Sequence, residues 1–337
     1  MSALKRATLC GLVGTTLIFM PLMPSAQAAQ SLAQVQAKVS QLEEEATSAA
    51  EGAQEAKVKL GALTKTLNGI KAKEAIQGKT LGALQKSLGT IAIEQYKAGG
   101  LSQSLELLFS SDPTLYLSSA GSLDAITRRK SAELRKYEAA QQRLSATTLT
   151  VNDKLALVTA AQKKFKAQSA LALSKLQEAE VLLSKLKKSD RDRLAKLAAA
   201  KEDADQASSQ VAAQSANGVS GRAGIALKFA LKQIGDRYVF GAAGLITWDC
   251  SGLTMRAYQA AGVSLPHSSA AQSRMGKKVS LKALKPGDLL FFGRPVSHVG
   301  MYLGGGRMVH APHSGSRVKV SPIGDMGRKR LVGARRY

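Results

Sequence analysis

The chain has 337 residues, and its 48 Lys and Arg against 24 Asp and Glu give a formal net charge of +24. The excess is uneven: residues 218–337 carry 19 Lys and Arg against 4 Asp and Glu, whereas residues 29–217 carry 27 against 20. A C-terminal part with this much positive charge indicates a polyanionic partner, namely nucleic acid, anionic lipid or an anionic cell-wall polymer. The alternative is that the charge mainly keeps the domain soluble.

The first 28 residues have the layout of a secretory signal peptide. Lys5 and Arg6 precede an apolar run over residues 9–23, and Ala26-Gln27-Ala28 follows as a cleavage site with small residues. The run is shorter than the roughly 20 residues that a membrane-spanning helix needs. We therefore expect a secreted, cell-wall-associated protein, for which anionic wall polymers are a better partner than nucleic acid.

Residues 29–206 are predicted to form an all-α helical hairpin or coiled coil. The segment is rich in Ala, Leu, Lys and Gln and contains a single proline, Pro113, as expected of long helices. We expect one helix over 31–97, a tip, and a second helix over 122–212 that folds back antiparallel to the first. Such an arm is either a spacer or a docking or occluding element. Small residues over 207–221 predict a linker.

Residues 222–337 are predicted to form one compact α+β domain, in which an antiparallel sheet packs on helices. Apolar spacing indicates helices over 224–234 and 251–261, and a polar helical stretch is expected around 269–275. Strands are predicted at 289–292, 297–303, 307–312, 317–320 and 330–334.

Cys250 is the only cysteine of the chain apart from Cys10, which lies in the predicted signal peptide. A leftover thiol in an exported protein is an intermolecular bridge, an inert buried residue or a reactive nucleophile. The predicted helix starts at Ser251, so the thiol lies where the helix dipole lowers a thiol pKa. We expect Gly252 to let a substrate backbone come close.

Two histidines are predicted to share one face of a hairpin. If Gly304-Gly305-Gly306 is a three-residue loop, Leu303 pairs with Arg307 and His310 lies opposite Gly300. His298 and His310 are then diagonal neighbours on one face, with room left between them by Gly300. A loop of two or four residues would place them on opposite faces.

A thiol beside a histidine whose ring is fixed by a third group is the arrangement that nucleophilic catalysis by cysteine needs. His298 as the base and His310 as the residue that orients it fit these roles. The alternatives are a metal site made of His298, His310 and Cys250, or histidines with no shared role.

Three blocks in this order resemble the NlpC-type cell-wall peptidases, which are papain-like cysteine enzymes: Asp249-Cys250-Ser251-Gly252-Leu253, residues 297–304, and Met308-Val309-His310-Ala311-Pro312. The resemblance runs from about residue 221 to the end. It implies Cys250 as nucleophile, His298 as base and His310 as third polar residue, with no cofactor and no metal. It also implies cleavage of peptidoglycan stem peptides, typically between γ-D-glutamate and meso-diaminopimelate.

The same resemblance assigns further roles. Tyr238 matches a tyrosine that helps at the oxyanion site, although the residues around it depart from the family pattern. Ser251 and Ser269 are expected at the substrate, with His267 standing where arginine is frequent in the family. Asp249 is expected either to bind a substrate ammonium group, which we favour, or to cap the helix.

The N-terminal half resembles the coiled-coil region of exported relatives, with residues 96–112 similar to their hairpin tip. This implies that the arm restrains the catalytic domain and docks to a membrane-embedded division or elongation complex. The alternative functions are a cell-wall amidase or cross-bridge hydrolase with the same triad, and a catalytically inactive coiled-coil protein that binds the wall.

Overall fold

The computed structural model describes residues 31–97, 113–214 and 218–337. The predicted signal peptide and the predicted hairpin tip at 98–112 lie outside these ranges. Within them, no helix has a stretch that is long and apolar enough to cross a membrane.

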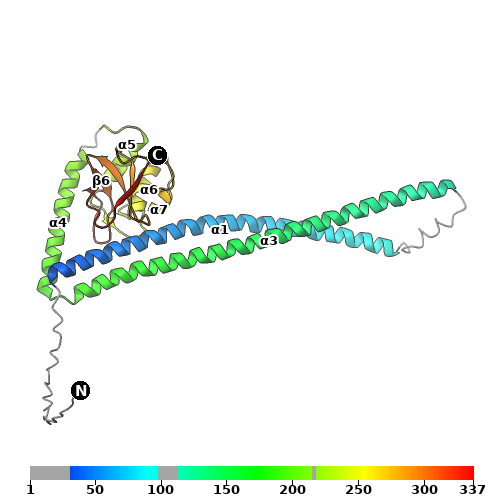
Figure 1. The fold of residues 1–337 in the computed structure, drawn as a ribbon, viewed down its shortest axis with the longest axis horizontal. Coiled ribbons are helices and arrows are strands. Elements are labelled where there is room, and N and C mark those ends of the chain that lie inside the picture. Colours follow the sequence, from blue (N-terminus) through cyan, green and yellow to red (C-terminus); the bar gives the residue numbers. More distant parts are fainter. Residues whose placement is uncertain (1–30, 98–112, 215–217) are drawn as a thin grey trace, which may run out of the picture.

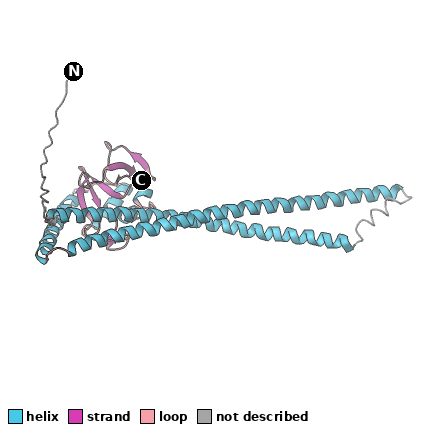
Figure 2. Ribbon diagram, turned by 60° about the horizontal axis from the view of Figure 1, so that its bottom comes forward, coloured by secondary structure: helices cyan, strands magenta, loops and turns pink. Residues whose placement is uncertain are grey.

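Two long helices form the predicted arm (Figure 1). Helix α1 (Leu32–Lys97) confirms the first predicted helix almost to the residue. Helix α3 (Pro113–Ser184) runs back beside it in the opposite direction, and the two cross midway along the arm (Figure 2). Pro113 is the first residue of α3, where its missing N–H costs no helical hydrogen bond. The second helix therefore begins earlier than the predicted residue 122.

The second predicted helix is broken in two, which corrects the single helix expected over 122–212. Helix α3 ends at Ser184, and α4 (Lys188–Gln214) begins after a turn. Within the turn, Leu186 packs against the cluster of Val35, Val39, Leu42 and Ala179 that joins α1 to α3. Turning the chain here leads α4 away from the arm and along the C-terminal domain (Figure 1).

Helix α4 covers one edge of the C-terminal sheet, at strand β7 (Lys319–Pro322). The buried Ser209 hydroxyl accepts a hydrogen bond from the Val320 amide at 2.8 Å, and Lys319 pairs with Asp205 at 2.8 Å. Residues 207–214 are thus helical and packed, whereas the sequence predicted a linker that starts at 207. The reason is that small residues let α4 approach the strand closely.

The C-terminal domain has three helices and a six-stranded antiparallel sheet with the order β3-β8-β4-β5-β6-β7. The helices are α5 (Gly221–Lys232), α6 (Cys250–Ala260) and α7 (Ser269–Gln272). The strands are β3 (Lys277–Val279), β4 (Leu289–Phe292), β5 (His298–Gly304), β6 (Arg307–His310), β7 and β8 (Leu331–Arg336). A separate parallel pair, β1 (Arg237–Tyr238) and β2 (Thr247–Trp248), precedes α6. The predicted α+β class is confirmed.

The sheet has an apolar cluster on each face. Leu289 and Phe291 belong to the larger core, which includes residues of α5 and α6 such as Leu227 and Leu253. Leu290 and Phe292 belong to a smaller core on the other face. Both faces of β4 are therefore buried, which explains why this strand reads as an uninterrupted apolar run.

The β5–β6 hairpin corrects the predicted loop but keeps the predicted register. Its turn has two residues, Gly305 and Gly306, both with positive φ (59° and 72°), as a tight hairpin turn requires. The register shifts by one residue between Tyr302 and Gly304, which is a bulge at Leu303. Beyond the bulge, Met301 pairs with Val309, so the extra residue compensates for the shorter turn and the two histidines remain on one face.

Candidate active site

The thiol of Cys250 lies at the first residue of α6. Asp249 is the N-cap of this helix, and its carboxylate accepts a hydrogen bond from the Gly252 amide at 2.6 Å. Cys250 is fully buried and is the free cysteine of the described chain. Its Sγ donates to the carboxylate of Glu51, at 3.0 Å from Oε1. A residue of the arm therefore contacts the thiol.

The two predicted histidines contact each other on the sheet. His298 Nε2 lies 2.8 Å from His310 Nδ1, and His310 Nε2 lies 3.1 Å from the Ser321 hydroxyl. The remaining ring nitrogen, His298 Nδ1, is buried and has no hydrogen-bond partner among the described residues. The chain Ser321–His310–His298 fixes the ring of His298 and leaves one nitrogen open, as a general base needs.

This geometry disfavours the alternative of a metal site. The facing nitrogens of His298 and His310 share a hydrogen bond, in which one carries the proton and the other uses its lone pair, so neither is free to bind an ion. No group of three His, Cys, Asp or Glu side chains in the described ranges is arranged to hold a metal ion.

Gly300 lies close to Met308 and His310. A Cβ at this position would lie 2.7 Å from Met308 Sδ and 3.3 Å from His310 Cβ. Both distances are shorter than ordinary van der Waals contact, so a side chain here would displace Met308 and press on His310. The room that Gly300 leaves is taken mainly by Met308, and its expected role between the two imidazole rings stays a prediction.

Burial holds both the thiol and the histidines in their neutral forms. The pKa of His298 lies well below its usual value, and burial lowers the pKa of His310 to about 3. Burial and then the charge of Glu51 raise the pKa of the Cys250 thiol well above its usual value. With the arm in place, the thiol of Cys250 is therefore in its protonated form.

Four donors converge on the carboxylate of Glu51. Oε1 accepts from the Cys250 thiol and from the Ser251 hydroxyl, the latter at 2.8 Å. Oε2 accepts from the Ser269 amide at 2.8 Å and from the Ser269 hydroxyl at 2.6 Å. We call Cys250, Ser251 and Ser269 the carboxylate cradle. Two of the three were expected from sequence at the substrate, and the structure brings them together around a carboxylate.

Tyr238 lies in β1 and is almost completely buried. Its hydroxyl has no hydrogen-bond partner among the described residues. Burial raises its pKa well above the usual value, and the neighbouring Cys250 charge acts in the same direction. The hydroxyl of Tyr238, which has the side chain of Thr47 in α1 beside it, is a candidate donor to an oxyanion. Its role there stays a prediction.

Asp249 and Gly252 each contact another part of the domain. The helix cap was one of the two roles expected for Asp249, whereas its contact with His267 was not predicted. Asp249 caps α6 and also contacts His267, whose Nε2 lies 2.8 Å from Oδ2. Burial alone would lower the pKa of His267, but this contact outweighs it and raises the pKa. A Cβ at Gly252 would lie 2.3 Å from the Ala242 carbonyl oxygen, so the space expected for substrate is filled by the protein itself. The expectation for Gly252 was wrong.

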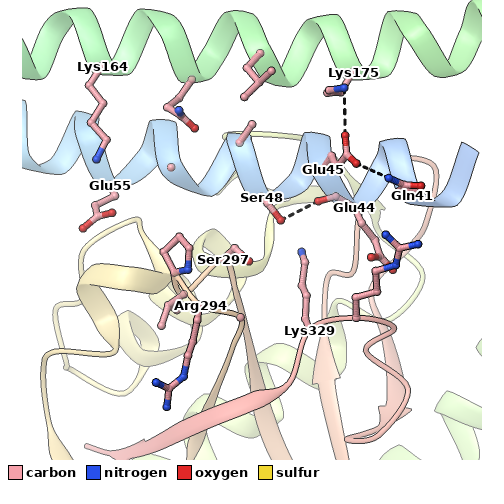
Figure 3. A pocket seen from close by; sticks show the side chains of 18 residues that line it. Gln41, Glu44, Glu45, Ser48, Glu55, Lys164, Lys175, Arg294, Ser297 and Lys329 are labelled. Atoms are coloured by element: carbon pink, nitrogen blue, oxygen red, sulfur yellow. Dashed lines mark hydrogen bonds and ion pairs between the residues drawn. The ribbon is translucent and has the colours of Figure 1, made fainter. Parts of the chain in front are cut away.

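Further contacts join the first part of α1 to the domain. Glu43 lies 3.6 Å from His313, and Glu55 lies 3.1 Å from Arg274. Burial raises the pKa of Glu43 to about 7. A cavity of about 620 Å³ lies between α1, α3 and the loops at 293–297 and 328–329 (Figure 3). This end of the arm therefore covers the site.

Sequence reasoning missed two residues of the site, Glu51 and Ser321. Glu51 lies in an acidic stretch of α1, and nothing local distinguishes it from its neighbours. Ser321 lies on β7, where His310 pairs with Lys319. Because residues two apart share a face, the register of β7 would have placed Ser321 beside His310.

The fold and the site together define an α+β domain in which the helix that begins with the thiol packs against the antiparallel sheet that carries the histidine pair. Residues 235–336 of this domain match the model of the NlpC/P60 family, so the chain carries an NlpC/P60 domain.

Curated relatives match over the same region. A probable endopeptidase of Mycobacterium tuberculosis is 43% identical over 121 residues, which are 36% of this chain and 31% of the relative. Peptidoglycan endopeptidase RipA of Mycolicibacterium smegmatis is 41% identical over 93 residues, 27% of this chain and 19% of its own length. A solved NlpC/P60 family protein from Bacillus cereus is 34% identical, covers 34% of this chain and 40% of its own, and has a TM-score of 0.33. The chain thus spans less than a third of these two curated relatives.

Proposed function

We propose that this protein is an exported peptidoglycan hydrolase that cleaves stem peptides between γ-D-glutamate and meso-diaminopimelate. Cys250 is the nucleophile, His298 the base and His310 the residue that orients the base. The observation that carries the proposal is the carboxylate cradle, because it binds a carboxylate directly beside the thiol. The relatives named endopeptidase support the reaction type.

A carboxylate beside the nucleophile suits a γ-linked glutamate. In that residue the scissile carbonyl belongs to the side chain, so its α-carboxylate is free and only a few bonds away. Ser251 and Ser269 can donate to it as they donate to Glu51. Charge-assisted hydrogen bonds of this kind contribute more than neutral ones to recognition. An ordinary α-peptide offers no carboxylate at this place.

The reaction begins when His298 Nδ1 takes the proton of the thiol and the thiolate adds to the scissile carbonyl carbon. The amide of Cys250 and the hydroxyl of Tyr238 donate to the oxyanion, a contribution of several kcal/mol when such donors are well placed. The C–N bond then breaks, and imidazolium His298 gives its proton to the leaving amine. Water, deprotonated by His298, attacks the thioester, which releases the γ-carboxylate and returns the thiol.

We assign the arm a regulatory role in this proposal. With Glu51 in the cradle, a substrate carboxylate has no place, and the thiol stays protonated. A partner that draws α1 away would open the site, and a membrane-embedded division or elongation complex is the partner that the coiled-coil resemblance suggests. The signal-like N-terminus and the basic domain support secretion and association with anionic wall polymers.

Digestion of purified peptidoglycan tests the proposed function. Residues 218–337 and the chain from residue 29 are each incubated with peptidoglycan containing diaminopimelate, and mass spectrometry identifies the new termini. We expect a new γ-D-glutamyl carboxyl terminus and a free diaminopimelate amine, in larger yield from the shorter chain. Cys250→Ala and His298→Ala should abolish both termini. New termini elsewhere, or full activity of Cys250→Ala, would overturn the proposal.

A further inference from the structure

Lys329 is a partly buried cation without a counter-ion. It lies in the loop between β7 and β8, flanked by the exposed Arg328 and Arg330. Its side chain takes part in no ion pair or hydrogen bond with the described residues, in contrast to Lys319, which has two carboxylate partners. Burial lowers its pKa, while the nearby Cys250, Glu44 and Glu51 act against that shift. An unpaired charge costs free energy when it is buried, so its position calls for a partner.

Lys329 lies on the side of the site where the two histidines are. It lines the cavity of about 620 Å³ together with Ser297, the residue before His298. It also lines a smaller cavity of about 170 Å³ together with His310. Neither cavity is lined by Ser251 or Ser269. Because the base protonates the leaving amine, the histidine side is the leaving-group side in the proposed reaction.

The arm places a carboxylate opposite this cation as well. Glu44 lines both cavities with Lys329, and in Figure 3 the Lys329 side chain extends toward the turn of α1 that carries Glu44. Glu44 and Glu51 are seven residues apart, which is roughly 10 Å along a helix at 1.5 Å per residue. Two carboxylates of α1 thus lie at the site, one in the cradle and one near Lys329.

We infer that Lys329 is a specificity-determining residue that binds a free carboxylate on the leaving-group side of the scissile bond, in the cavities that Glu44 also lines when the arm is docked. The inference rests on the proposed function, because it needs that reaction to define the two sides. The leaving residue is a diamino acid with a carboxyl group near its amine and a second one at the end of its side chain. The docked arm fills the cradle with Glu51 and places Glu44 near Lys329 without pairing with it, so Lys329 is left for a carboxylate of the substrate.

Binding without turnover tests the inference. The parent is the chain from residue 29 with Cys250→Ala, which prevents cleavage, and Glu51→Gln, which weakens the arm. Calorimetry measures the affinity of this parent for two peptides. The first is L-Ala-γ-D-Glu-meso-diaminopimelate, and the second is the same peptide with the diaminopimelate carboxyl groups amidated. We expect Lys329→Met to weaken binding of the acid peptide about tenfold and to leave the amidated peptide unchanged, since one charge-assisted contact is lost only in the first case. Lys329→Arg should retain most of the affinity.

Arg328→Met is the matched control, because it removes one positive charge from an exposed neighbour that lines the larger cavity. This substitution should change the affinity for either peptide by less than about twofold. An equal loss for both peptides, an equal effect of Arg328→Met, or no binding of the acid peptide by the parent would overturn the inference. Hydrolysis plays no part in this measurement, so failure of the proposed reaction would be seen separately, as the absence of Cys250-dependent termini.

Discussion

Replacing Glu51 by glutamine should expose the thiol of Cys250. Glutamine has the size of glutamate but carries no charge. Its NH2 group would face hydrogen-bond donors of the cradle, so some of the four hydrogen bonds to Glu51 are lost. The docked arm then loses its main polar contact with the site. In a chain that starts at residue 29, Cys250 is the only cysteine, so its alkylation reports directly on access.

The contacts set the size of the effect. Hydrogen bonds to a charged group contribute about 1.5–3 kcal/mol each, but desolvation of the fully buried carboxylate offsets much of their sum. Burial, followed by the charge of Asp249, raises the pKa of Glu51, which shows that this cost is present. A net loss equivalent to one such bond, about 1.5–3 kcal/mol, increases the undocked fraction about tenfold to hundredfold.

The assay is the rate of alkylation by iodoacetamide as a function of pH. Removing the charge of Glu51 also lowers the thiol pKa, so a rate at one pH would mix two effects. The plateau at high pH reports access, and the midpoint reports the pKa. The control is Glu55→Gln, which breaks a partly exposed pair with Arg274 worth under about 1 kcal/mol. A Glu51→Gln plateau equal to those of the wild type and the control would refute the reasoning.

Three further predictions concern packing and charge. Gly300→Ala should lower the free energy of unfolding by about 1–3 kcal/mol, because its Cβ meets Met308 and His310, whereas Gly333→Ala, with nothing within 4 Å, should be nearly neutral in the same urea titration. Ser209→Ala should cost about 1–3 kcal/mol by leaving the buried Val320 amide without its acceptor, and amide exchange at Val320 should rise; unchanged exchange would contradict this. Burial raises the pKa of Glu43 from 4.5 to about 7, so the folded chain holds the proton of this side chain more tightly than the unfolded chain does. The contribution of Glu43 to the free energy of unfolding is therefore complete below pH 4.5 and is lost as the pH rises from 4.5 to 7. Between pH 4.5 and 7, the Glu43→Gln chain should therefore become more stable relative to the wild type, by up to about 3 kcal/mol. Urea midpoints that change with pH equally in the two chains would rule out this effect.

The thiol and the histidine pair could be predicted from the sequence because short-range rules position them. The acid before Cys250 caps the helix, which places the thiol at a helix start. Strand alternation places His298 and His310 on one face. The loop length was wrong, yet the result held because the bulge at Leu303 restores the register. Such compensation between a turn and a bulge has no clear signal in a glycine run.

The contacts across the arm could not be predicted in the same way. Glu51 reaches residues about 200 positions away in the chain, and its partners depend on how the arm lies against the domain. The break after Ser184 shows the same limit, because it serves the packing of Leu186 on α1. Periodicity indicates that a segment is helical, but it does not indicate where tertiary contacts turn the chain.

One side chain gives the proposed restraint two effects at once. Glu51 fills the cradle, which excludes a substrate carboxylate, and its negative charge opposes formation of the thiolate. Both effects end when α1 moves away, so the site gains space and reactivity in a single step. A neutral plug of the same shape would block the cleft but leave the thiol easier to ionise. If the proposed hydrolysis of peptidoglycan is correct, a glutamate suits this domain, because it also suppresses the chemistry in any molecule whose arm is only partly displaced.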